Sequence, residues 1–260
     1  MTNQSITIAI ANQNGGVGKT TTTMNLGAAL AEAGDRILLV DLDPQGTLTI
    51  AHGFDPDGLS NTIYTALVDS SFDVKQAILH TVNGPDLIPA NLDLSAAEVE
   101  LLNEIGRETF LKDALRPIAS NYDFVLIDCP PSLGLLTING LVAANVIIIP
   151  VATQYLRFRG LKLLLETIQR VRDKFNPSLP PPHFLPTMFQ ARTIHSREVV
   201  EELHNTFPSQ VFDTVIRYTV RLAEAPINGQ SILKYEKASQ HAEAYRMLAK
   251  EVKSWLNVNQ

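Results

Sequence analysis

The sequence predicts an α/β fold in which a doubly wound, mostly parallel β-sheet is flanked by helices. Short apolar runs alternate along the chain with longer stretches of helical periodicity. Most of these runs are continuously apolar, as expected of parallel strands that are buried on both faces. A glycine-rich loop joins the first run to the first helical stretch, and ligands of such sheets bind at the carboxyl ends of the strands.

The elements follow from these runs in chain order. The candidate strands are Ile6–Ala11, Arg36–Asp41, Asp86–Pro89, Phe124–Asp128, Val146–Val151, His183–Met188 and Val211–Val215. The candidate helices are Thr20–Ala33, Ala96–Glu104, Glu108–Ser120, Leu135–Ala143, Leu156–Phe175, Ser196–Thr206 and Ser239–Leu256. Gly34 is placed to end the first helix, because glycine readily adopts the left-handed conformation found there. No linker-like segment divides the chain, so one domain is expected over residues 1–260.

Composition excludes several classes of protein. The net charge of −6 argues against a globally basic nucleic-acid binder, although a local basic patch is compatible with it. Cys129 is the only cysteine, so no disulfide framework is possible and a cytoplasmic protein is expected. No apolar run approaches the roughly 20 residues that span a membrane, and the N-terminus lacks the features of a secretory signal.

The glycine-rich loop has the composition of a phosphate-binding site. Its glycines let backbone N–H groups approach phosphate oxygens, and the N-terminus of the following helix adds a favourable dipole. Lys19 is expected to reach the terminal phosphates, and the Thr20 hydroxyl is expected to bind Mg²⁺. The common P-loop pattern has its first glycine where Gln13 stands here. The predicted ATP-binding residues are Asn14, Gly15, Gly16, Val17, Gly18, Lys19, Thr20 and Thr21.

Carboxylates end two of the predicted strands. Asp41 and Asp43 occupy alternate positions, so their side chains are expected to point to the same side, where they can hold the waters of magnesium and position an attacking water. Asp128 ends an apolar run in a Walker B pattern and is expected to orient magnesium through water. The predicted metal site is therefore Thr20, Asp41, Asp43 and Asp128. Cys129 has no nearby histidine in the sequence and is predicted to be a small buried residue.

These motifs resemble those of the ParA/MinD group of dimerising ATPases. The loop resembles the deviant Walker A sequence Lys-Gly-Gly-x-Gly-Lys-Ser/Thr, except that Asn14 replaces its first, signature lysine. The resemblance to ParA/Soj-type partition ATPases extends from Ile6 to Val252. It includes the segments Asp41–Gly46, Asp128–Pro131, Thr187–Thr193 and Val220–Pro226.

The resemblance implies a single ParA-like ATPase domain that binds ATP with Mg²⁺ and forms a homodimer around the nucleotide. It assigns catalysis to Lys19, Asp43 and Asp128. In this group the signature lysine reaches the phosphates of the partner subunit. Asn14 carries no charge and cannot neutralise the transition state, and losing such a cation costs on the order of 10³ or more in rate. Slow hydrolysis is therefore expected.

Three explanations of Asn14 stay open. The first is that the chain is a slow-hydrolysis variant, engineered or natural, that persists as an ATP dimer. The second is that another cation, such as Arg157 or Arg159, substitutes for the lysine. The third is that the chain belongs to a divergent branch, such as the carboxysome-positioning McdA-type relatives.

The resemblance also implies a nucleoid-associated protein. In Soj-type members, arginines at the positions of Arg192 and Arg221 bind DNA without sequence preference, and Arg217 lies in the same cationic region. The expected partner is a ParB-type or adaptor protein that stimulates hydrolysis. The expected cargo is a plasmid or chromosome, or alternatively a protein organelle such as the carboxysome.

Two other classes of function remain as rivals. A MinD-like membrane-surface ATPase ends in a basic amphipathic helix, whereas the last helix here lacks a run of cations, so no membrane binding is expected. Its stripe of Tyr245, Leu248, Val252 and Trp255 is predicted to pack in the core. A metabolic P-loop enzyme, such as a small-molecule ligase, would need a substrate pocket, and nothing in the sequence indicates one.

Overall fold

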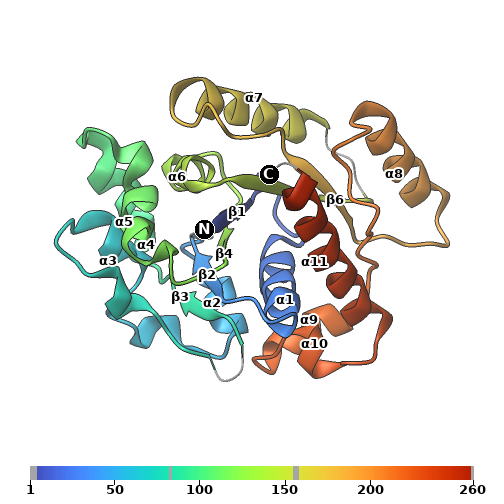
Figure 1. The fold of residues 1–260 in the computed structure, drawn as a ribbon, viewed down its shortest axis with the longest axis horizontal. Helices are drawn as coiled ribbons and strands as arrows, with labels where there is room; N and C mark the ends of the chain where they lie inside the picture. The colour runs from blue at the N-terminus through green and yellow to red at the C-terminus, as the bar shows by residue number, and fades with distance from the viewer. Residues whose placement is uncertain (1–4, 82–83, 155–157, 259–260) are drawn as a thin grey trace.

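The computed structural model describes residues 5–81, 84–154 and 158–258 and confirms the α/β fold. Six parallel strands form one sheet in the order β3-β2-β4-β1-β5-β6 (Figure 1). The central position of β1 places the loop that follows it in the middle of the sheet edge. The strands are β1 (Ile6–Ile10), β2 (Ile37–Asp41), β3 (Asp86–Ile88), β4 (Phe124–Asp128), β5 (Val146–Ala152) and β6 (His183–Thr187).

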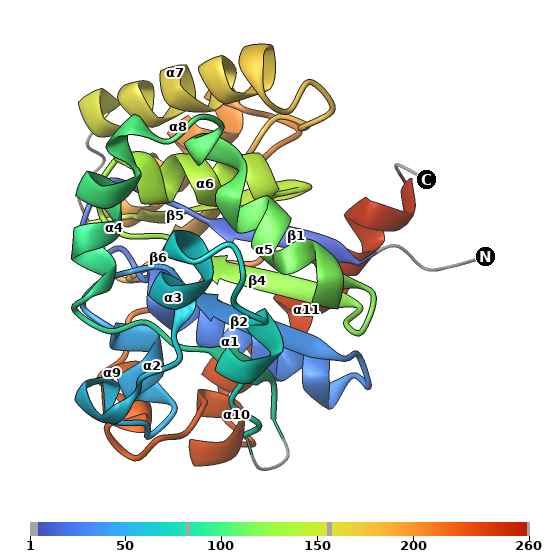
Figure 2. The same cartoon turned by 90° about the vertical axis from the view of Figure 1, so that its left-hand side faces the viewer.

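Helices cover both faces of the sheet (Figures 1 and 2). The longer helices are α1 (Lys19–Glu32), α4 (Leu94–Glu100), α5 (Phe110–Ala119), α6 (Leu135–Ala143), α7 (Phe158–Lys174), α8 (Ile194–Thr206), α9 (Arg221–Ile227) and α11 (Gln240–Val258). The shorter ones are α2 (Thr47–Ala51), α3 (Ile63–Val68) and α10 (Ile232–Tyr235), and 3₁₀ turns occur at Pro56–Gly58, Val74–Ala77, Leu101–Asn103 and Arg107–Thr109.

The continuous apolar strands supply two separate cores. On β2, Leu38 and Val40 enter the core that α3, α5, α6 and α7 complete. The alternate residues Ile37 and Leu39 enter the core formed with α1 and α11. The interior positions of β2 are therefore apolar on both sides, because each face of the sheet meets a helical layer.

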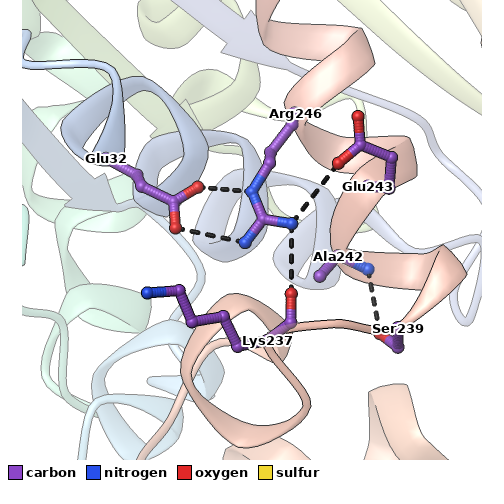
Figure 3. A network of polar contacts seen from close by, with 6 residues as sticks. All are labelled: Glu32, Lys237, Ser239, Ala242, Glu243 and Arg246. Atoms are coloured by element: carbon purple, nitrogen blue, oxygen red, sulfur yellow. Dashed lines mark hydrogen bonds and ion pairs between the residues drawn. The ribbon is translucent and has the colours of Figure 1, made fainter.

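An arginine attaches α11 to α1 on the second face. Figure 3 shows the guanidinium group of Arg246 held by both carboxylate oxygens of Glu32, and its Nη1 also donates to the Lys237 carbonyl at 3.1 Å. The Glu243 carboxylate forms an ion pair with the same guanidinium group, with 3.5 Å between Oε2 and Nη1. In the stripe predicted for the last helix, Tyr245, Leu248 and Val252 are buried and Trp255 is partly buried against the same core, so the prediction of core packing is confirmed.

The prediction of a seventh strand over Val211–Val215 is wrong. This segment makes only a single bridge to β6, between Val211 and Phe184. The N–H groups of Asp213 and Thr214 instead donate to the carboxylate of Glu251, at 2.7 and 3.2 Å. Pro186 in β6 also has no N–H group to donate. Both features interrupt the ladder that a seventh strand would need.

The remaining strand boundaries agree closely with prediction, whereas the helix predicted over Ala96–Glu104 begins at Leu94 and gives way to a 3₁₀ turn after Glu100. All six observed strands begin and end within one residue of the predicted positions, and Gly34 follows α1 with a φ of 97°. The predicted start of α7 at Leu156 lies outside the described residues. The short helices α2, α3, α9 and α10 were not predicted, because so few turns leave little periodicity to detect. Among the helices described, none combines the length and apolarity needed to cross a membrane.

Candidate nucleotide-binding site

The glycine-rich loop lies between β1 and α1 in a conformation that leaves the first turn of the helix open. Gly16 and Gly18 have φ values of 71° and 90°, a region that side chains rarely adopt. Gly18 is the N-cap of α1, and no side chain caps the helix. The free N–H groups of the first turn are therefore available to an anion such as a phosphate.

Two residues to which the sequence assigned no role hold this loop to neighbouring strands. The buried Asn12 amide donates to the Pro150 carbonyl at 2.8 Å and accepts from the Asn14 N–H at 2.9 Å. From the other side, the Thr187 hydroxyl at the end of β6 donates to the Val17 carbonyl at 2.8 Å. β5 and β6 follow more than 130 residues after the loop, so no local sequence signal predicts these contacts.

Lys19 lies inside the loop rather than in solvent. Its side chain is buried, and its ammonium group donates to the Asn14 carbonyl at 3.0 Å. Burial lowers the pKa of Lys19, whereas the neighbouring Asp128, Cys129 and Asp43 raise it. The ammonium group therefore lies at the loop in which the terminal phosphates are expected to bind.

Asp128 presents a free buried carboxylate oxygen at the base of the loop. The residue is 1% exposed, its Oδ1 accepts from the Thr23 hydroxyl at 3.4 Å, and its Oδ2 has no hydrogen-bond partner. Burial raises the pKa of Asp128, the adjacent Asp41 raises it further, and Thr20 and Lys19 lower it. An unsatisfied carboxylate oxygen beside a threonine hydroxyl suits a hard divalent cation, so these residues fit Mg²⁺.

Asp41 is directed toward α2. It lies beside Asp128 in the β2–β4 register and is fully buried. Its Oδ2 accepts from both the N–H and the hydroxyl of Thr49, at 2.9 and 2.8 Å, and its Oδ1 accepts from the Asp43 N–H at 3.2 Å. Burial raises its pKa, and the bonds from Thr49 lower it. Asp41 therefore acts on the site through the Asp43 loop, and its place among the metal residues stays a prediction.

Asn14 is half-buried and lies against the start of α7. A Cβ atom added to Gly160 would lie 3.4 Å from the Asn14 amide nitrogen and 2.3 Å from that of Gln13. These two amides therefore occupy the space above Gly160. The proposed substitutes for the signature lysine cannot be placed, because Arg157 and the Arg159 side chain lie outside the described residues.

The three predicted DNA-binding arginines lie on segments that follow β6. Arg192 is exposed in a turn and makes no hydrogen bond or ion pair within the described part of the chain. The backbone of Arg217 forms an isolated β-bridge with that of Phe189, and its guanidinium group donates to the Gln240 side chain at 3.0 Å. Arg221, at the start of α9, is paired with Glu224 at 2.8 Å and Glu236 at 4.0 Å. Of the three arginines, Arg192 is therefore the one whose guanidinium group would break no hydrogen bond or ion pair with a described residue when it binds a phosphate.

Known proteins are similar to this chain in sequence and in fold. A family model described as "AAA domain" matches residues 5–180. The Soj protein of Bacillus subtilis is 47% identical over 94% of this chain and 97% of its own length. The chromosome partitioning protein ParA of Myxococcus xanthus is 45% identical over 94% of this chain and 87% of its own. The chain belongs to the ParA/Soj family of partition ATPases.

Two solved structures extend the comparison of this ParA/Soj-family chain. A Mycobacterium smegmatis protein described as cobyrinic acid a,c-diamide synthase, with bound ADP and magnesium, superposes with a TM-score of 0.87 and 40% identity, covering 98% of this chain and 97% of its own. Apo McdA of Cyanothece gives a TM-score of 0.81 at 25% identity, covering 94% and 98%. The full-length matches show that the family fold spans nearly the whole chain.

Proposed function

We propose that this chain is a magnesium-dependent ATPase that dimerises around ATP, binds DNA without sequence preference and positions cargo on the nucleoid. The carrying observation is the loop built around the buried Lys19, beside the free carboxylate oxygen of Asp128. Membership of a family of partition ATPases supports the same function.

The residues of the site have distinct roles in this proposal. The open N-terminus of α1 and the glycines hold the phosphates, and Lys19 neutralises their terminal charge. Thr20 and Asp128 would hold Mg²⁺, which when bound offsets negative charge on the phosphates. Asp43, half-buried on the loop that Asp41 supports, orients the attacking water.

Hydrolysis by this site is slow in our proposal, because Asn14 carries no charge to offer to a partner subunit. The ATP dimer would then persist until a ParB-type or adaptor protein accelerates its turnover. DNA would bind at Arg192, with Arg217 and Arg221 adding to the same cationic region. The cargo is a plasmid or chromosome; the similarity to McdA favours a protein organelle as the alternative.

Two rival functions have less support from the structure. The apolar stripe of α11 is buried against α1, so it is not presented to a membrane. The name of the Mycobacterium smegmatis neighbour favours a small-molecule ligase as a second candidate. Cavities of about 630 and 590 Å³ exist, but no residue of the glycine-rich loop lines either of them.

The deciding experiment measures binding to a random-sequence DNA duplex with Mg²⁺ and ATP, ADP or no nucleotide across a salt series. The proposal requires that the chain bind DNA with ATP but not with ADP or without nucleotide, and that this DNA binding weaken steeply as salt rises. Lys19→Ala should abolish it, and ATP binding measured separately shows whether the nucleotide site is intact. ATP binding without DNA binding would overturn the proposal and favour the ligase.

A further inference from the structure

A groove of about 590 Å³ lies on the flank of the molecule formed by α3, α4 and α5, where these helices lie together (Figures 1 and 2). All the residues that line this groove lie in the part of the chain that the structure describes. This volume is within the range of sites that bury a compact ligand. The groove is separate from the nucleotide site, since none of the residues lining it belongs to the glycine-rich loop.

The floor of the groove is apolar. Leu67 and Leu101 line it at 4% exposure, and Phe72 and Phe110 are partly buried against the same core. These side chains come from α3 and the residues after it, from the 3₁₀ turn at Leu101–Asn103 and from the start of α5. Their apolar surface would be covered by an occupant that carries apolar side chains of its own.

The rim is acidic and poorly compensated. Five exposed carboxylates surround the floor, and Arg116 is the one cation that lines it among the described residues. Arg116 lies 3.4 Å from Asp113, so it neutralises one of the five. The other four carboxylates form no ion pair with any described residue; they are Asp69, Asp73, Glu100 and Glu104.

The rim carboxylates are spread around the groove instead of converging on one point. No group of three or more His, Cys, Asp or Glu side chains in the described residues is arranged to hold a metal ion. A single small cation therefore cannot satisfy them. An extended partner with several cations can, because lysine and arginine cover apolar surface with their stems while their charged ends reach acidic groups.

We propose that this groove docks a basic amphipathic peptide segment of a partner protein, whose apolar side chains enter the floor while its lysines or arginines meet the rim. The inference goes beyond the proposed function, because it concerns a surface away from the nucleotide and from Arg192. Binding of the peptide to this groove requires neither ATP nor DNA.

The test uses three synthetic helical peptides of equal length as probes: one of leucine and lysine, one with serine in place of leucine, and one with glutamate in place of lysine. Fluorescence anisotropy measures their binding to the full chain without nucleotide. The groove variant is Glu100→Lys/Glu104→Lys. The matched control is Glu201→Lys/Glu202→Lys, which reverses two exposed charges on α8, next to the opposite edge of the sheet (Figure 1).

The leucine–lysine peptide should bind the unmodified chain and the α8 control with similar affinity. The groove variant should bind it roughly tenfold more weakly, since each exposed ion pair contributes up to a few-fold and reversal adds repulsion. The serine–lysine and leucine–glutamate peptides should bind much more weakly than the leucine–lysine peptide.

Three results would overturn the proposal. Equal weakening by the groove and α8 variants would indicate a general attraction to an acidic protein. Equal binding of the serine–lysine peptide would show that the apolar floor is not used. Self-association of the chain that the groove variant abolishes would assign the groove to a second copy. Unchanged ATP binding by both variants shows that they are folded, and a failure of DNA binding leaves these outcomes unaffected.

Discussion

At the scale of single residues, the site departs from its family pattern at one position that alters chemistry. Asn14 can donate hydrogen bonds but cannot supply charge. Its backbone carbonyl nevertheless receives the Lys19 ammonium at 3.0 Å, a contact that does not depend on the side chain. A substitution at this position should therefore change turnover more than it changes nucleotide binding.

Asn14→Lys should raise the ATP turnover of the dimer by at least tenfold, toward the effect of about 10³ that a cation supplied in trans can have. The measurement is phosphate release at saturating ATP and DNA. Asn14→Gln is the control, because it lengthens the side chain without charge. Equal rates for all three proteins would show that another group already neutralises the phosphates.

Thr49 is a second residue whose loss should be measurable. Its buried hydroxyl donates to Asp41 at 2.8 Å and accepts from the Ala90 N–H at 3.1 Å. Thr49→Val removes both bonds, which leaves the Ala90 N–H without its acceptor and Asp41 Oδ2 with the Thr49 N–H as its donor, and it should lower the free energy of unfolding by about 1–3 kcal/mol. Thr49→Ser keeps the hydroxyl and should restore most of the loss. Urea unfolding tests both variants, and a valine variant as stable as the unmodified chain would contradict this role.

At the scale of elements, α11 attaches to the molecule by different contacts along its length. Arg246 pairs with Glu32 on α1, and Lys253 pairs with Asp35 at 2.7 Å. Near its end, Trp255 stacks on Phe212 with ring centroids 4.1 Å apart and lies equally close to His183. The aromatic cluster thus joins α11 to β6 and to the segment that follows β6.

This cluster makes stability depend on pH. Burial lowers the pKa of His183 to about 4, from an unfolded value of 6.5. Between these values the unfolded chain binds a proton that the folded chain does not, so stability is present above pH 6.5 and is lost as the pH falls. Since His183 is partly exposed, its contribution is on the order of 1–2 kcal/mol.

His183→Phe keeps an aromatic ring in the cluster and removes the titration. The variant should lose less stability than the unmodified chain between pH 6.5 and pH 4. Urea titrations that follow the fluorescence of Trp255, the only tryptophan, give the comparison directly. Parallel pH profiles would show that His183 does not titrate in this range.

At the scale of the whole molecule, a net charge of −6 means that the proposed DNA binding needs a local cationic surface. Among the described residues no acidic side chain pairs with Arg192, whereas Arg221 is paired with Glu224 and Glu236. Binding DNA through Arg221 must therefore break or share existing ion pairs.

Arg192→Ala should weaken DNA binding and lower the slope of log affinity against log salt by about one per protomer. Arg221→Ala should have a smaller effect on both quantities. Lys112→Ala, an exposed change on α5, is the control and should leave binding unaltered. A larger loss for Arg221→Ala than for Arg192→Ala would contradict this ranking.

The sequence alone determined the architecture and predicted a position for the nucleotide site. Continuous apolar runs identify buried parallel strands, and a glycine-rich loop between strand and helix identifies a phosphate site, because both signals lie in consecutive residues. The same local logic failed for Val211–Val215, whose N–H groups are taken by Glu251, almost 40 residues further along the chain.

Only the tertiary structure decided which distant groups complete the site. Asn12 and Thr187 hold the loop to β5 and β6, Thr49 directs Asp41 toward α2, and one oxygen of Asp128 is left free. The acidic groove likewise exists only because α3, α4 and α5 meet. Such contacts join residues far apart in the chain, and spacing along a sequence carries no information about which of them folding brings together.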